Sequence, residues 1–187
     1  MVDGKRRDVM QRFKEFSFFV LLLLITYGFA GCSYSSVNDD KLADDIAQKI
    51  VKAIENKDTE ALKALYSDFA LDEIENFNES ASTAEMLFHG KVIDFKGKTN
   101  QGSRRFGKGG YIFFCAKYDI ETDEDSYIIE FWYCAMHREQ PEKVGIQCII
   151  IANKEDTLLN QKKYNNFIAT YLKKDTMGFF LYEYEED

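Results

Sequence analysis

Hydrophobic positions change their spacing about halfway along the chain. Between residues 39 and 56 an apolar side chain recurs every three or four positions, which predicts an amphipathic helix whose apolar stripe is Leu42, Ile46, Ile50, Val51 and Ile54. Asp39 and Asp40 suit the positive end of that helix. Three shorter helical segments are predicted at residues 59–67, 71–76 and 84–88.

After Gly90 the pattern becomes that of strands. We predict strands at residues 91–96, 111–121, 126–137, 144–153 and 177–183, separated by turns at 100–103, 107–110, 122–125 and 138–143. Residues 156–175 have helical spacing and would form a helical insertion before the last strand. Helices followed by an antiparallel sheet indicate an α+β fold, and residues 39–187 have the length of a single domain.

The first 31 residues have the parts of an export signal. Five basic residues precede an uncharged run from Phe16 to Gly31, and the run ends in Ala30, Gly31 and Cys32. This pattern predicts a lipoprotein signal peptide (residues 1–31), a diacylated Cys32, and a tether of residues 32–38. The domain would then lie on the extracytoplasmic side of the cell membrane, anchored by lipid. Phe29 stands where such signals usually have an aliphatic residue, so an uncleaved anchor is an alternative, and a cytosolic protein is a third.

Charge and cysteine content exclude several classes of function. Without residues 1–31 the chain has 19 basic and 29 acidic side chains, and an acidic surface makes nucleic acid an unexpected partner. Neither a phosphate-binding glycine loop nor a nucleophile elbow is present, and we expect no cofactor. Cys115, Cys134 and Cys148 have no metal-site spacing, so no metal is expected. They would be buried thiols, although Cys134 could pair with Cys148.

Three stretches resemble a known superfamily. Residues 53–67 (AIENKDTEALKALYS) are similar to the helix–turn–helix opening of nuclear transport factor 2-like (cystatin-like cone) domains, and residues 69–77 and 140–146 support this. Within it, residues 40–152 resemble an uncharacterised family of Gram-positive lipoproteins that carry a domain of unknown function. The resemblance implies helices packed on a strongly curved antiparallel sheet. It implies no reaction, because such cones include enzymes, binding proteins and scaffolds.

Strand pairing decides which side chains share a face of the sheet. If Asp119 faces Tyr127, then Tyr118, Glu130 and Trp132 lie together on a concave, helix-covered face and could line a ligand pocket. Glu130 would be a lone carboxylate among apolar side chains and therefore a candidate general base. The alternatives are a Glu130 near the open end of the cone, a Glu130 paired to a lysine or arginine from a helix, and a Tyr118 and Trp132 that belong to the core.

The remaining hypotheses concern partners. The opposite face of the sheet mixes aromatic and polar side chains and could mediate a homodimer. A small basic loop formed by Arg104, Arg105 and Lys108 could meet an anionic ligand or simply be solvated. The leading hypothesis is a non-catalytic, membrane-tethered module that binds a small apolar ligand or an envelope protein. The alternative is a small hydratase- or isomerase-like enzyme with Glu130 as its base.

Overall fold

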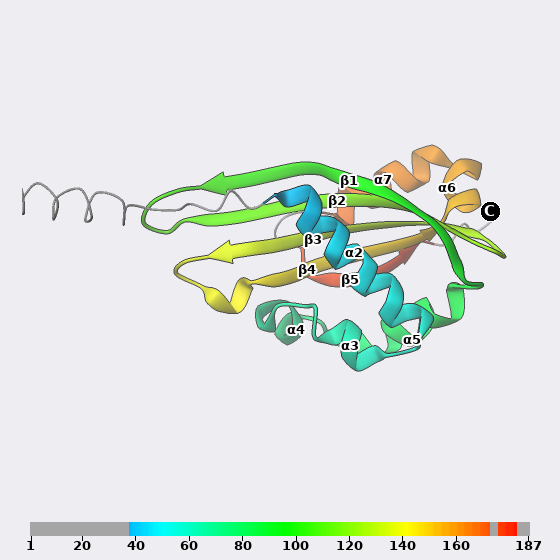
Figure 1. Ribbon diagram of the computed structural model, residues 1–187, viewed down its shortest axis with the longest axis horizontal. Coiled ribbons are helices and arrows are strands. Elements are labelled where there is room, and N and C mark those ends of the chain that lie inside the picture. Colours follow the sequence, from blue (N-terminus) through cyan, green and yellow to red (C-terminus); the bar gives the residue numbers. More distant parts are fainter. Residues whose placement is uncertain (1–37, 173–175, 183–187) are drawn as a thin grey trace, which may run out of the picture. The chain divides into compact units, whose positions relative to one another are not determined.

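The structure is a computed structural model that describes residues 38–172 and 176–182 (Figure 1). The predicted signal peptide, Cys32 and all of the tether except Asn38 lie outside the described residues. Within the described part, helices are too short or too polar to cross a bilayer.

The helical first half is set by polar caps and by one strong apolar stripe. Helix α2 (Asp39–Glu55) confirms the predicted helix, and the Asn38 side chain accepts a hydrogen bond from the Lys41 amide at its start. Helices α3 (Thr59–Lys63), α4 (Asp68–Glu73) and α5 (Phe77–Leu87) follow. Helix α4 begins earlier than predicted because the Ser67 hydroxyl accepts the Ala70 amide hydrogen bond at 3.0 Å.

Five strands form one sheet in the order of the chain. They are β1 (Val92–Arg105), β2 (Tyr111–Thr122), β3 (Ser126–His137), β4 (Gly145–Asn153) and β5 (Gly178–Tyr182), with a short helix η1 (Pro141–Lys143) between β3 and β4. Strands β1 to β4 are antiparallel. The predicted turn at residues 100–103 is wrong, because this segment continues β1 past a bulge between Thr99 and Gln101.

The last strand departs from the predicted antiparallel sheet. β5 pairs with β4 in parallel, because α6 (Lys154–Leu159) and α7 (Gln161–Tyr171) carry the chain back along the sheet before β5 begins. The predicted helical insertion is therefore two helices, and it starts at Lys154 rather than at residue 156.

Helices pack on both faces of the sheet. Helix α2 crosses one face obliquely in Figure 1, and α2 to α5 share a core there with Phe114, Tyr118 and Phe131. On the other face, α7 packs against a second cluster of buried residues: Phe113, Cys115, Trp132, Cys134, Cys148 and Ile150. The α+β class is confirmed. Helix α7 therefore covers residues of β2, β3 and β4 on the sheet face opposite α2.

The β2–β3 turn sets a register that differs by one residue from the expected pairing. Glu121 pairs with Ser126, so Asp119 pairs with Ile128 rather than with Tyr127. The turn is held by Thr122, whose hydroxyl donates to the Asp125 carbonyl and accepts from the Asp125 amide. A shift of one residue turns a strand over, so Glu130 and Trp132 lie on the face opposite Tyr118.

The β3–β4 register does not bring Cys134 and Cys148 opposite each other, as a disulfide between them would need. Cys148 pairs with Trp132 and Cys134 pairs with Gly145, and the register shifts between Trp132 and Tyr133. Both cysteines are buried free thiols, as is Cys115.

Candidate functional site

The three predicted pocket residues do not come together. Tyr118 is buried beneath α2, where its hydroxyl donates to Asp44 Oδ1 at 2.7 Å and its ring stacks on Phe95. Trp132 lies on the other face, and its indole N–H donates to the Leu172 carbonyl at 3.2 Å. The predicted pocket of Tyr118, Glu130 and Trp132 is therefore wrong, because the β3 register places two of them across the sheet from the third.

Glu130 is the centre of a buried polar cluster on the α7 side. Its Oε1 lies 3.0 Å from Lys117 Nζ on the neighbouring strand and accepts a 2.9 Å hydrogen bond from the Tyr164 hydroxyl on α7. The Glu130 side chain is 7% exposed, whereas that of Lys117 is 35% exposed. Burial, reinforced by the Glu130 charge, raises the pKa of Tyr164, which keeps its hydroxyl a donor.

This geometry is that of a structural contact between α7 and the sheet. The expected location of Glu130 in a concave, helix-covered pocket is wrong. Glu130 does pair with a basic side chain, but that lysine comes from β2 and not from a helix, as the alternative had expected. The partner is a strand lysine, joined by a helix tyrosine. A catalytic role for Glu130 stays a prediction.

The three core cysteines are protected by burial. Burial, followed by the nearby Glu130 charge, raises the pKa of the Cys115 thiol to about 12, and burial also raises the pKa of Cys148. Thiols in this state are weak nucleophiles and weak metal ligands. Across residues 38–172 and 176–182, no three His, Cys, Asp or Glu side chains gather as a metal site.

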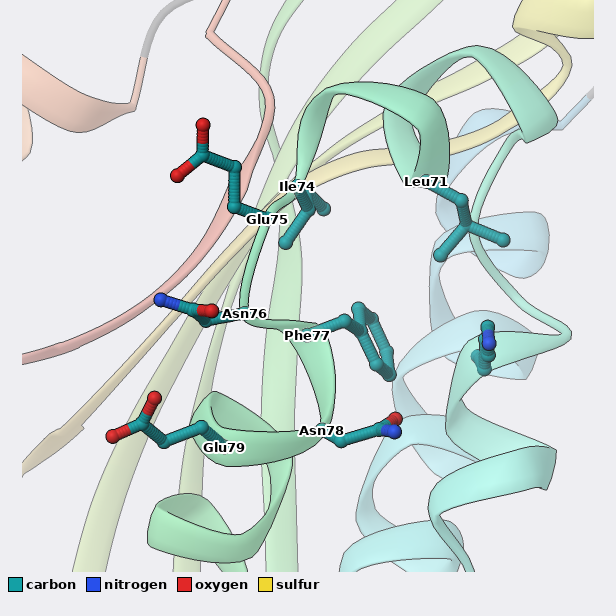
Figure 2. Close-up of a pocket in the computed structure, with 8 residues that line it drawn as sticks. Leu71, Ile74, Glu75, Asn76, Phe77, Asn78 and Glu79 are labelled. Carbon is teal, nitrogen blue, oxygen red and sulfur yellow. The ribbon is translucent and has the colours of Figure 1, made fainter.

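A surface hollow of about 390 Å³ lies where α4 passes into α5. Its lining combines apolar side chains with charged and amide groups: Lys63, Leu71, Ile74, Glu75, Asn76, Phe77, Asn78 and Glu79. Figure 2 shows Glu75, Asn76 and Glu79 extending to the same side, away from Leu71. Asn76 precedes α5 but its side chain makes no capping hydrogen bond.

The floor of this hollow is anchored to the core. Phe77 is buried and packs edge-on against Tyr66, with ring centroids 5.0 Å apart, and also contacts Phe179 on β5. Leu71 and Ile74 remain half-buried, so they present apolar surface to the hollow. The sequence analysis missed this site. The available signal was the alternation of apolar and polar residues from Leu71 to Glu79 at a helix junction.

A second hollow of about 400 Å³ lies between the end of α2 and α3. Its lining is the more apolar of the two, but it consists of Leu65, three alanines and long polar side chains, and Asn56 in it already donates to the Lys52 carbonyl. We take the α4–α5 hollow as the candidate site, because an aromatic and two aliphatic side chains line it together with two carboxylates.

Comparison with known proteins gives a family. The model of a domain of unknown function, DUF5104, matches residues 49–155. The chain belongs to the DUF5104 family. No curated protein sequence matches the chain.

The DUF5104 match covers the candidate hollow and part of the Glu130 cluster. It runs from the second half of α2 through β4 to the first residues of α6, and so includes both Lys117 and Glu130. Tyr164, the rest of α7 and β5 follow it in the chain. Helix α7, which covers the sheet face opposite α2, therefore belongs to a segment that follows the matched DUF5104 region.

Proposed function

We propose that this DUF5104 protein is a membrane-tethered, non-catalytic module on the extracytoplasmic side of the membrane that binds a small ligand in the α4–α5 hollow. The ligand has an apolar body and a cationic group. The observation that carries the proposal is the hollow itself, which half-buried Leu71 and Ile74 line on one side and Glu75 and Glu79 on the other (Figure 2).

The size and charge of the hollow favour such a ligand. A volume of about 390 Å³ falls within the range of small-molecule sites, and the lining exposes more polar than apolar surface, so polar groups of a ligand would also be bound there. Two carboxylates against the single ammonium of Lys63 give the lining a negative balance, which favours a cation. The rigid floor provided by Phe77 reduces the entropy that binding would cost.

A panel of small amines with aromatic or branched aliphatic bodies tests this proposal on the full-length chain in detergent. Compounds that raise the melting temperature would be titrated calorimetrically. We expect Leu71→Asn and Glu79→Gln each to weaken binding by about tenfold, equivalent to about 1.4 kcal/mol. Leu158→Asn and Glu155→Gln make the same changes on exposed positions of α6 and should leave affinity unchanged. Binding that is insensitive to Leu71 and Glu79 would refute the site.

The membrane tether is proposed from the residues before the domain. The basic start, the uncharged run and Ala30-Gly31-Cys32 support a diacylated Cys32. Labelled palmitate should be incorporated into the wild-type chain and not into Cys32→Ser, which should also leave the membrane fraction. Retention of Cys32→Ser in membranes would favour the uncleaved anchor instead.

Kinship with nuclear transport factor 2-like cones also remains a proposal. It is supported by the opening motif at residues 53–67 and by helices that cover one face of a long-stranded sheet. The parallel β5 and the α7 cover are additions to that plan. An experimental structure whose residues 39–153 failed to superpose on such cones would remove the proposal.

A further inference from the structure

Strand β1 is a long edge strand. It spans 14 residues at one end of the strand order, and its pairing within the described residues is with β2. An edge of this length presents a row of backbone N–H and C=O groups that can pair with another extended chain. Natural proteins usually keep such edges short, bulged, charged or covered, and β1 has irregularities between Val92 and Asp94 and between Thr99 and Gln101.

Carboxylates already occupy part of this edge. The Val92 amide donates to Glu55 Oε1 at 2.9 Å, and the Thr99 amide donates to Asp40 Oδ1 at 3.2 Å. Both acceptors belong to α2, which runs beside β1. The Phe95 amide also donates to a carboxylate, that of Asp94, the preceding residue of β1. Amide hydrogens of β1 thus bond to carboxylate oxygens, where a neighbouring strand would supply carbonyl oxygens.

The second half of β1 and the turn that follows it are strongly basic. Residues 96–108 contain five basic side chains and no acidic one, in a chain whose net charge is −8: Lys96, Lys98, Arg104, Arg105 and Lys108. Arg104 forms an ion pair with Asp39 at the start of α2. Among the described acidic residues, none forms an ion pair with Arg105 or Lys108. Phe106, at the tip of the hairpin, is 60% exposed.

We propose that residues 100–105 of β1 bind an extended, acidic segment of a partner protein as an added strand. The backbone edge supplies the hydrogen bonds, and alternate side chains of the added strand meet Lys98, Arg105 and Lys108. Exposed Phe106 offers an apolar anchor at the end of the strand. This surface is separate from the α4–α5 hollow, so it goes beyond the function proposed above and does not depend on it.

Charge complementarity selects this occupant over other anions. The surface is a strand edge, and only an extended peptide can satisfy its amide and carbonyl groups together. Nucleic acid could use the basic side chains, but its backbone has no amide groups that could pair with the carbonyls of β1. A polyanion that binds equally well is therefore a distinct outcome of the test.

The test uses fluorescein-labelled octapeptides and the full-length chain in detergent. The probe alternates Thr and Glu, a second peptide alternates Pro and Glu, and a third alternates Thr and Lys. Fluorescence anisotropy should show binding of the Thr–Glu peptide, at least tenfold weaker binding of the Pro–Glu peptide, and none of the Thr–Lys peptide. Amide hydrogen exchange should slow at residues 100–105 when the Thr–Glu peptide is bound.

Matched charge variants separate this edge from general electrostatics. Lys98→Glu combined with Arg105→Glu should weaken Thr–Glu binding by at least tenfold. Lys49→Glu combined with Lys162→Glu makes the same change in net charge on α2 and α7, and should leave binding within about twofold. The proposal is overturned if the Pro–Glu peptide or an eight-nucleotide thymidine strand binds as tightly as the Thr–Glu peptide. It is also overturned if no peptide binds or residues 100–105 gain no protection.

Discussion

Replacing Lys117 by methionine tests whether the Glu130 cluster fastens α7 to the sheet. The substitution leaves a buried carboxylate with the Tyr164 hydroxyl, at 2.9 Å, as its remaining close partner among those described. Breaking a buried ion pair costs about 3–5 kcal/mol. Because the Lys117 side chain is 35% exposed, water can reach the vacated side, and we expect about 2 kcal/mol of destabilisation.

The triple variant Lys117→Met, Glu130→Met and Tyr164→Phe removes the whole polar cluster. Apolar groups of similar volume then fill the same space, so its stability should return to within about 1 kcal/mol of the wild type. Lys98→Met is the matched control, because Lys98 pairs with Lys117 across β1 and β2 but is exposed. Its effect should stay within about 0.5 kcal/mol.

Urea unfolding followed by Trp132 fluorescence measures these differences. Trp132 is the single tryptophan of the chain, is buried beside α7, and donates to the Leu172 carbonyl. With a slope of about 2 kcal/mol per molar, the Lys117→Met midpoint should fall by about 1 M urea. A Lys117→Met midpoint equal to that of Lys98→Met would show that the ion pair does not stabilise the fold, and so would a triple variant as unstable as Lys117→Met.

Three further predictions follow from single contacts. A Cβ on Gly97 would lie 2.3 Å from the Lys117 carbonyl and the Tyr118 ring, so Gly97→Ala should cost about 1–3 kcal/mol in urea unfolding, whereas Gly102→Ala, with its nearest atom at 3.5 Å, should be tolerated. Hydrogen bonds from Thr99 lower the pKa of Asp40 in the folded protein, so this contact stabilises the fold above the ordinary carboxyl pKa, and the stabilisation is lost as the pH falls through the lowered pKa of the folded state. The Thr99 amide resonance should report that titration, and Asp40→Asn should abolish it. In a Cys32→Ser variant, the pKa of Cys115 near 12 and the burial of all three remaining thiols predict no rapid reaction with a thiol reagent at pH 8, and three reactive thiols after unfolding.

Much of the fold could be predicted because its signals are local. The stripe from Leu42 to Ile54 fixes α2, and long apolar runs bounded by turn residues fix β2, β3 and β4. The continuation of β1 could not be predicted in this way, because residues 100–103 have a turn-like composition. Pairing with β2 outweighs that local preference, and the bulge at Thr99 absorbs the irregularity.

The parallel β5 was also beyond local signals. Its own sequence indicates a strand but carries no information about direction. The direction of the strand depends on whether the preceding helices carry the chain back along the sheet, as α6 and α7 do here. Buried Tyr164 and the hydrogen bond from Trp132 to the Leu172 carbonyl hold α7 in that position. Such long-range packing is visible only once the second face of the sheet is known to need a cover.

The predicted pocket of Tyr118, Glu130 and Trp132 failed because of the register of one hairpin. The turn at residues 122–125 was predicted at its observed place, but the pairing of Asp119 with Tyr127 is one residue away from the register that a four-residue turn sets. The observed register puts Glu130 on the α7 side, next to Lys117. The Glu130 carboxylate, which was a candidate base in a pocket, instead holds α7 to the sheet through Tyr164. The surfaces proposed for binding lie away from this cluster, at the α4–α5 junction and along the basic part of β1.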